Sequence, residues 1–213
     1  GTLDFNPGTG TEYISSGPHN GVFVLKLNND GNFEWAKNAV GGSGQNYGYS
    51  IATDSFGSIY LTGSFRETAY FDTGTEYLEI VSAGYSDIFI LKLDTTGNFI
   101  WTKQIGGTSM EVINSITTDL YGNIYTIGRF EGTISFDPSG VSNNLKAIGQ
   151  ADVFIQKLDN NGNLLWFKQM GGVDYNYGSA IVTDIKGNVF TTGAFLGTTD
   201  FDPGTGVANL TSN

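Results

Sequence analysis

Residues 87–107, DIFILKLDTTGNFIWTKQIGG, consist of two short apolar segments around an Asp-x-x-Gly-Asn turn, with a Trp in the second segment and two Gly residues at the end. The same pattern occurs as GVFVLKLNNDGNFEWAKNAVGG at 21–42 and as DVFIQKLDNNGNLLWFKQMGG at 152–172. Trp35, Trp101 and Trp166 are 66 and 65 residues apart, so a unit of about 65 residues repeats along the chain. The sequence therefore predicts an array of similar units.

Each unit is predicted to contain four short strands. In the copy with the clearest pattern they span Tyr49–Thr53, Ile59–Phe65, Ile88–Leu93 and Phe99–Gln104. The alternation of apolar residues predicts a hairpin that places Leu93 opposite Phe99 and Leu91 opposite Trp101, with Phe99 and Trp101 on one face. Both faces of this hairpin are largely apolar, which is typical of a sheet packed between two others.

Turns of the Asp-x-x-Gly type join the strands of each hairpin. The Asp accepts hydrogen bonds from the amides that follow, and the Gly adopts the left-handed conformation that closes a type I turn with a bulge. We therefore interpret a set of recurring residues as structural, the turns by their Asp and Gly and the Trp residues by packing between units: Asp54, Gly57, Asp94, Gly97, Asp119, Gly122, Asp159, Gly162, Asp184, Gly187, Trp35, Trp101 and Trp166. One extra residue in AKNAVGG of the first copy predicts a β-bulge there.

A longer connection, such as ETAYFDTGTEYLEIVSAGYS at 67–86, separates the two hairpins of a unit. Phe5, Phe71, Phe136 and Phe201 mark its four copies. Because it is long for a simple loop, it is predicted to add a short ribbon to the edge of each sheet.

Four antiparallel strands per unit without helices predict an all-β fold of radially packed blades, a β-propeller. The three units span about 1–66, 67–131 and 132–196, and 197–213 repeats residues 1–17 as a partial fourth unit. Complete blades are predicted at about 44–105 and 109–170, with half-blades at 21–38 and 174–201. Closed propellers have about four to eight blades, so this one is expected to be incomplete or open within the chain. The chain starts and stops within a repeat, and we interpret it as a piece of a longer or processed polypeptide.

Two stretches carry a family resemblance, namely YGYSIATDSFGSIYLTG at 47–63 and FILKLDTTGNFIW at 89–101, followed by Gly106 and Gly107. In this combination the chain resembles the bacterial beta-propeller repeat (SBBP) family over essentially its whole length. The Phe-Asp-Pro-Gly stretch at 201–204 is similar to inserts in large secreted or surface proteins of Bacteroidetes-type bacteria. The resemblance implies a propeller fold and an extracellular or cell-surface setting, and it implies no uniform activity.

The composition excludes several classes of function. A formal net charge of −11 repels polyanions, so nucleic acid is not an expected partner. The absence of Cys excludes disulfides and thiolate chemistry. No apolar run approaches the roughly 20 residues that span a bilayer, so membrane insertion is not expected.

The sequence offers little that favours catalysis. His19 is the only His, and it lies beside Pro18 in the least repetitive connection. Asp94, Gly97 and Trp101 are the residue types of a sialidase Asp-box, but their spacing differs, and the chain has only two Arg residues for a substrate carboxylate. A pair of carboxylates for glycoside hydrolysis stays open as the weakest alternative. We therefore predict that the chain is not an enzyme.

Two ligand hypotheses remain, and no other cofactor is expected. Carboxylates beside Gly-rich loops suggest calcium, although none has the D-x-D-x-D-G spacing: Asp72, Asp137, Asp200 and Asp202. Aromatic residues just after the double Gly favour core packing at a strand entry, with stacking on a sugar as the alternative: Tyr47, Tyr49, Tyr175 and Tyr177. Six Lys residues recur on the outer hairpins and are interpreted as protection of sheet edges, with an anion-binding stripe as the alternative: Lys26, Lys37, Lys92, Lys103, Lys157 and Lys168.

Together these observations predict a noncatalytic extracellular module with a structural or adhesion role in a bacterial surface or secreted protein. Its half-blades are expected to be completed by strand addition, giving a ring or a filament through self-association or through neighbouring repeats of a longer polypeptide. A glycan-binding, lectin-like propeller is the second hypothesis, and a carboxylate-dependent glycoside-active enzyme is the third.

Overall fold

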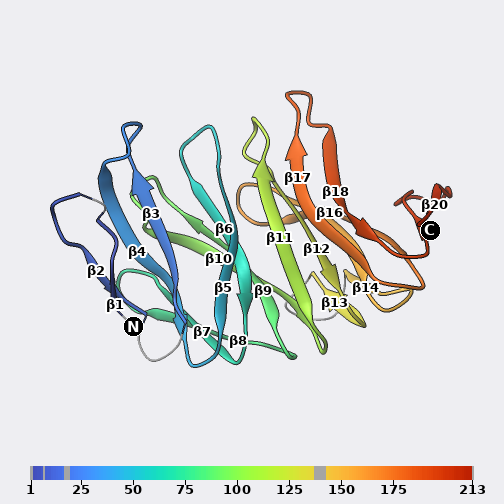
Figure 1. The fold of residues 1–213 in the computed structure, drawn as a ribbon, viewed down its shortest axis with the longest axis horizontal. Coiled ribbons are helices and arrows are strands. Elements are labelled where there is room, and N and C mark those ends of the chain that lie inside the picture. The colour runs from blue at the N-terminus through green and yellow to red at the C-terminus, as the bar shows by residue number, and fades with distance from the viewer. Residues whose placement is uncertain (1, 7, 17–19, 137–142, 213) are drawn as a thin grey trace.

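A computed structural model describes residues 2–6, 8–16, 20–136 and 143–212 of the chain. Over these residues the fold has twenty β-strands in five sheets and no helix. The sheets stand side by side along the long axis, from the N-terminal to the C-terminal end (Figure 1). The predicted all-β fold of open propeller-type repeats is confirmed. The described part of the chain accordingly contains no helix that could cross a membrane.

Two central sheets each contain the four strands of a blade in meander order. In one sheet these strands are β5 (Asn46–Thr53), β6 (Ile59–Phe65), β9 (Asp87–Leu93) and β10 (Phe99–Gly107). In the other sheet they are β11 (Glu111–Thr118), β12 (Ile124–Phe130), β15 (Asp152–Leu158) and β16 (Leu164–Gly172). The middle pairs have equivalent registers, because Ile59 faces Leu93 in one blade and Ile124 faces Leu158 in the other. Equivalent turns thus produce equivalent blades.

Half of a blade lies at each end of the stack. The hairpin of β3 (Val22–Leu27) and β4 (Phe33–Gly42) corresponds to the two outer strands, and that of β17 (Asn176–Thr183) and β18 (Val189–Phe195) to the two inner strands. Strands β1 (Thr2–Asp4) and β2 (Tyr13–Ser15) form a small separate sheet. Within the described residues, one edge of β3 and one edge of β18 therefore have no strand partner.

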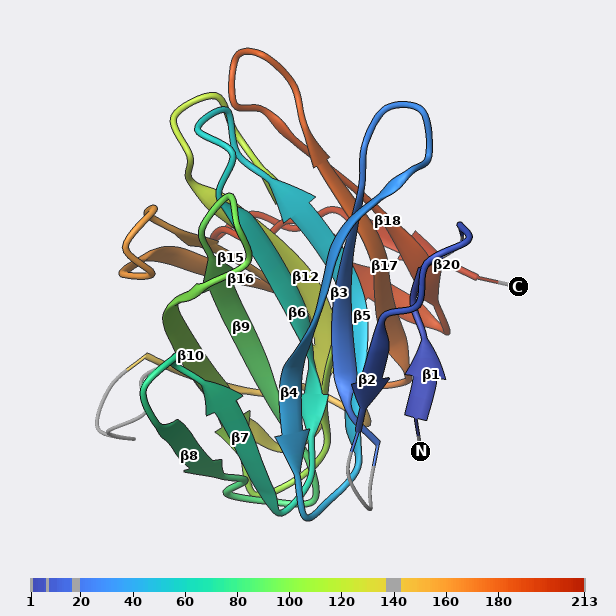
Figure 2. The ribbon, with the colours of Figure 1, turned by 90° about the vertical axis from the view of Figure 1, so that its left-hand side faces the viewer.

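The predicted edge ribbons are present, and each joins two units. They are formed by β7 (Thr68–Asp72) with β8 (Tyr77–Val81), by β13 (Thr133–Ser135) with β14 (Asn144–Lys146), and by β19 (Thr198–Asp200) with β20 (Asn209–Thr211). Each ribbon pairs with the outer strand of the preceding unit, as β7 does with β4 in Figure 2. The Phe of the ribbon packs on its own unit, and the ring centres of Phe71 and Phe89 are 5.7 Å apart. The ribbon thus fastens one blade to the next.

The buried apolar side chains form three clusters, each between two neighbouring units. One cluster contains Leu61 and Phe89, a second contains Tyr60 and Ile90, and a third contains Tyr125 and Ile181. Adjacent residues of one strand enter different clusters because side chains alternate between the faces of a sheet. Both faces of the central blades are therefore buried only when neighbours are present, as in other repeat proteins.

The extra residue of the first unit forms a β-bulge, as predicted. Val22 faces Val40 and Phe23 faces Asn38, so Ala39 is the additional residue on β4. The second unit has no bulge at this point, because Ile88 faces Ile105 and Phe89 faces Gln104. Because the bulge takes up the one inserted residue, the Gly residues that follow keep the same pairing with the ribbon as in the second unit.

The predicted register of Trp101 is wrong. Phe99 faces Leu93 as predicted, but the ladder shifts after Phe99 and Trp101 faces Lys92 instead of Leu91. One bulged residue changes the face of every side chain after it. Phe99 accordingly packs on the cluster that contains Leu61, whereas Trp101 packs on the cluster that contains Tyr60.

Candidate functional site

The candidate functional site is the repeated contact between successive units, which we call the seam. The sequence indicated the turn residues of these units, and the structure shows which groups their side chains bind. Oδ1 of Asp94 accepts hydrogen bonds from the backbone amides of Thr96 (2.8 Å) and Asn98 (2.9 Å). The amide of Asn98 is the main cause of a pKa of about 2 for Asp94.

The same arrangement recurs in the other turns that were interpreted as structural. Their carboxylates hold the two equivalent amides: Asp54, Asp119, Asp159 and Asp184. The turn glycines have φ angles of 78–84°, which favour Gly: Gly57, Gly97, Gly122, Gly162 and Gly187. These groups are occupied by the backbone of their own turns.

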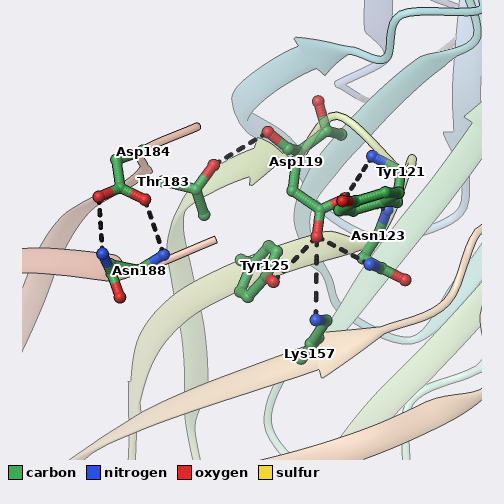
Figure 3. Close-up of polar contacts among 9 residues, drawn as sticks. Asp119, Tyr121, Asn123, Tyr125, Lys157, Thr183, Asp184 and Asn188 are labelled. Carbon is green, nitrogen blue, oxygen red and sulfur yellow. Dashed lines mark hydrogen bonds and ion pairs between the residues drawn. The ribbon is translucent and has the colours of Figure 1, made fainter. Parts of the chain in front are cut away.

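Asp119 extends its turn into the blade through its second oxygen, Oδ2 (Figure 3). This oxygen accepts hydrogen bonds from the Tyr125 hydroxyl (3.0 Å) and from Asn123 Nδ2 (2.7 Å), and it lies 3.8 Å from Lys157 Nζ. Burial opposes the charge on Asp119, but these hydrogen bonds outweigh it and lower its pKa. Burial also raises the pKa of Tyr125, so its hydroxyl remains a donor. Tyr60 donates in the same way to Asp54 (2.9 Å).

Hydroxyl groups connect the inner strands of successive units. Ser50 Oγ accepts a hydrogen bond from the backbone amide of Ile116 (3.2 Å), and Ser115 Oγ accepts one from Ile181 (3.4 Å). Thr183 Oγ1 donates to the carbonyl oxygen of Thr118 at 3.1 Å, a contact drawn in Figure 3. Because the pattern repeats with the period of the sequence, these bonds fix the stagger of one unit against the next.

The outer hairpins use Trp and Lys to hold the turn of the following unit. Lys92 Nζ donates to the carbonyl oxygen of Asn160 (2.9 Å), and Trp101 Nε1 donates to the same oxygen (3.4 Å). Lys37 Nζ donates to Asn98 Oδ1 (2.7 Å). Protection of a sheet edge is therefore the wrong interpretation for Lys92, which is 9% exposed and lies over the Tyr60 ring.

The double Gly makes room for buried carboxylates that the sequence did not single out. A Cβ atom on Gly106 would overlap the carboxylate of Asp87, and one on Gly171 would overlap that of Asp152. Asp87 Oδ2 accepts hydrogen bonds from the Ala83 amide (3.0 Å) and from Gln104 Nε2 (2.6 Å). Burial raises the pKa of Asp87, and the hydrogen bonds oppose this rise. The recurrence of Asp at the start of the third strand, with Gln in the fourth, was the available signal.

Glu111 is the second buried carboxyl group at this place. It is fully buried, and its Oε1 is among the buried atoms of the described residues without a hydrogen-bond partner. Burial and the nearby Asp87 raise the pKa of Glu111 to about 8. The equivalent residues are Asn46 and Asn176, whose amide groups donate to backbone carbonyls of the neighbouring segments. The second unit thus carries an acid where the other units carry an amide.

The four tyrosines proposed for sugar stacking form two separate pairs. Tyr47 and Tyr49 stack on β5 with ring centres 6.2 Å apart, and Tyr175 and Tyr177 stack with centres 6.0 Å apart. Strand β11 lies between β5 and β17, so the pairs do not meet (Figure 1). The guanidinium group of Arg129 lies over the Tyr177 ring, with its Cζ atom 4.9 Å from the ring centre. Only the first pair presents well-exposed rings.

The described carboxylates proposed for calcium hold their own loops. Asp72 Oδ1 accepts from the Gly74 amide (2.7 Å), and Asp202 Oδ1 accepts from that of Gly204 (2.7 Å). Asp200 Oδ1 accepts from the amides of Asp202 and Ala208. Within the described ranges, no three acidic or His side chains converge as a metal site would need. Asp137 lies outside the described residues, and calcium binding stays a prediction.

Comparison with known proteins agrees with this repeat geometry. Residues 34–64 and 100–129 match the profile of the family described as beta-propeller repeat (SBBP). In these two segments the chain is similar to SBBP repeats. Each matched segment runs from the outer strand of one blade through the two inner strands of the next, and it includes the turn that follows the double Gly.

Two individual proteins show a more distant similarity. An uncharacterized WD repeat-containing protein, L264, of Acanthamoeba polyphaga mimivirus is 28% identical over 178 residues. The alignment covers 78% of this chain and 13% of that relative, so this chain spans a small part of its length. A solved protein of unknown function from Bacteroides caccae has 12% identity and a TM-score of 0.33, with 89% of this chain and 69% of that chain covered. A likeness of that degree carries no argument.

Proposed function

We propose that this chain is a noncatalytic structural and adhesion module of a bacterial surface or secreted protein. Its SBBP repeats and unpaired end strands assemble it into a ring or a filament. The observation that carries the proposal is the use of its chemically distinctive side chains in contacts within and between units. Asp119, Lys92 and Trp101 all have their polar groups engaged in the seam or its turns. Side chains engaged in this way hold the repeats together and leave few polar groups that could act in catalysis.

The extracellular setting is tested in cells that express the protein. An antibody against the chain, applied to intact cells and to the medium, is expected to detect it outside the cell. Protease treatment of intact cells should remove the signal, and a cytoplasmic protein measured in parallel should survive. Retention of the whole signal inside protease-resistant cells contradicts the proposed setting. Unchanged attachment of cells that lack the protein would contradict the adhesion role.

Glycan binding is a second candidate, and the exposed tyrosine pair favours it. Tyr47 is 38% exposed and Tyr49 is 44% exposed, and their nearly parallel rings offer apolar faces of the kind that stack on sugars. A glycan array with the wild-type chain and the Tyr49→Ala variant tests this idea. Binding that requires Tyr49 supports a lectin-like site, and an array without signal in the presence or absence of calcium removes it.

A further inference from the structure

We propose that a second copy of this chain completes the half-blade of β17 and β18 by pairing its strand β3 with β18. This inference rests on the proposed structural function and identifies the partner as the hairpin β3–β4 of the second copy. The resulting sheet has the strand order of the two complete blades. The seam that already repeats along one chain then continues across two chains.

Both strands expose large apolar side chains at positions that are buried in the complete blades. Tyr60 on β6 is 0% exposed, whereas the equivalent Phe190 on β18 is 56% exposed. Phe89 on β9 is 0% exposed, whereas the equivalent Phe23 on β3 is 53% exposed. Large apolar side chains at positions that are buried in complete blades mark an interaction surface. Tyr60 and Phe89 lie in different clusters on opposite faces of the sheet, so in the joined copies Phe190 faces the blade that follows the new blade and Phe23 faces the blade that precedes it.

The register of the new pair follows from the two complete blades. The pairs Leu61–Leu91 and Thr126–Gln156 correspond to Thr191 of one copy opposite Leu25 of the other. Gly193 then lies opposite Phe23. The pair of Gly63 and Phe89 in one complete blade shows why, because a Cβ atom on that Gly would lie 2.7 Å from the Phe ring. Gly193 keeps the same space available for Phe23.

The turn that contains Gly31 in the hairpin of the second copy also has a matching surface on the first copy. A Cβ atom on Gly97 would lie 2.8 Å from Trp35, and one on Gly162 would lie 3.2 Å from Trp101. Each of these turns thus rests on the Trp of the preceding unit. The equivalent Gly31 has no atom within 4 Å of its Cβ position. Pairing of β3 with β18 places the Gly31 turn of the second copy over Trp166 of the first.

The edge ribbons affect the affinity with which β3 of one copy pairs with β18 of the other. Strand β16 already pairs with β19, so the ribbon β1–β2 of the incoming copy has no outer strand to join. Its Phe5 now packs on Phe23, with ring centres 4.7 Å apart, while Phe201 packs on Phe195 at 5.2 Å. In a complete unit a single ribbon Phe packs on the third strand. Phe201 of one copy must therefore replace Phe5 on the Phe23 ring of the other.

This exchange gives two matched variants with opposite expected effects. Phe5→Ala removes the competitor and should strengthen self-association about 2- to 10-fold, and Phe201→Ala removes the replacement and should weaken it by a similar factor. Sedimentation velocity over a wide range of chain concentrations measures the dissociation constants. Thermal melting of each variant confirms that the monomer is folded. A wild-type chain that stays monomeric at every concentration, or equal effects of the two variants, overturns the proposal.

Crosslinking tests the register independently of these variants, because the chain has no Cys. A Thr191→Cys chain is mixed under mild oxidation with an isotope-labelled Leu25→Cys chain, and mixed disulfides are identified by mass. The control mixture combines Thr191→Cys with a Ser55→Cys chain. Faster crosslinking of the Leu25→Cys mixture supports the register, and equal rates in the two mixtures overturn it. Neither result alters the cell-surface test, so failure of this inference is distinguishable from failure of the proposed function.

Discussion

Replacement of Glu111 by Asn should remove a pH-dependent weakness from the second unit. Glu111 is fully buried, and Asn46 and Asn176 occupy the same position in the other two units. The amide of Asn176 donates to the carbonyl oxygens of Ala151 (3.3 Å) and Asp174 (3.1 Å). An Asn at position 111 is expected to donate the equivalent pair of hydrogen bonds, of which a protonated carboxyl group could donate only one.

The magnitude follows from the pKa of Glu111. Burial and the nearby Asp87, with a smaller effect of Glu131, raise this pKa from 4.5 to about 8. The folded state therefore binds the proton more tightly than the unfolded state, and stability falls as the pH rises from 4.5 toward 8. One pKa unit corresponds to about 1.4 kcal/mol, so at pH 7 the loss is on the order of 3 kcal/mol. At pH 4 the loss nearly vanishes, because Glu111 is protonated in both states.

Urea denaturation of the wild type and of Glu111→Asn at pH 4 and pH 7 measures this effect. The stability gained by the variant should be about 3 kcal/mol larger at pH 7 than at pH 4. Glu79→Gln on the exposed face of β8 serves as the control, since it removes one negative charge without changing a buried site. A gain that is the same at both pH values would refute the reasoning, because it would show that Glu111 does not hold its proton in the folded state.

The remaining predictions concern single contacts and are each measured by urea denaturation at neutral pH. Gly106→Ala should destabilise the chain by about 1–3 kcal/mol because its Cβ overlaps the Asp87 carboxylate, whereas the equivalent Gly41→Ala, with its nearest atom 3.8 Å away, should have little effect. Tyr60→Phe should cost about 1–2 kcal/mol through the lost hydrogen bond to the turn carboxylate. Ser115→Ala should cost about 1 kcal/mol because the Ile181 amide loses its acceptor. Equal effects of the two Gly variants, or costs near zero for the other two, would contradict the assigned contacts.

The repeat period and the turn chemistry made most of the fold predictable. Asp94, Gly97 and the extra residue in AKNAVGG each have a local physical meaning, since a carboxylate holds amides, a Gly permits positive φ and an inserted residue forms a bulge. The face of the sheet on which Trp101 lies was not predictable in the same way. A second bulge after Phe99 reverses the alternation without any change in the length of the repeat.

The partner of each ribbon could not be read from the sequence, because backbone pairing leaves little trace in side-chain pattern. Phe71 indicated that the connection recurs, but not that its strand pairs with the preceding unit while its ring packs on its own. The buried carboxylate of Asp87 was missed for a related reason. A polar residue at the start of a strand is ordinarily exposed, and only the opposing Gly106 in three dimensions shows that the carboxylate is enclosed.

Departures from the repeat are more informative about function than the repeat itself. Asp87 occurs with Gln104, and Asp152 occurs with Gln169, as partners in one buried contact. In the first unit both partners change together, to Gly21 and Asn38, on the hairpin that we infer to meet a second chain. A rigid buried contact between Asp and Gln is useful where the ribbon of a unit stays bound to that unit. Its absence beside β1–β2 agrees with our proposal that this ribbon releases Phe23 when β3 pairs with β18 of another copy.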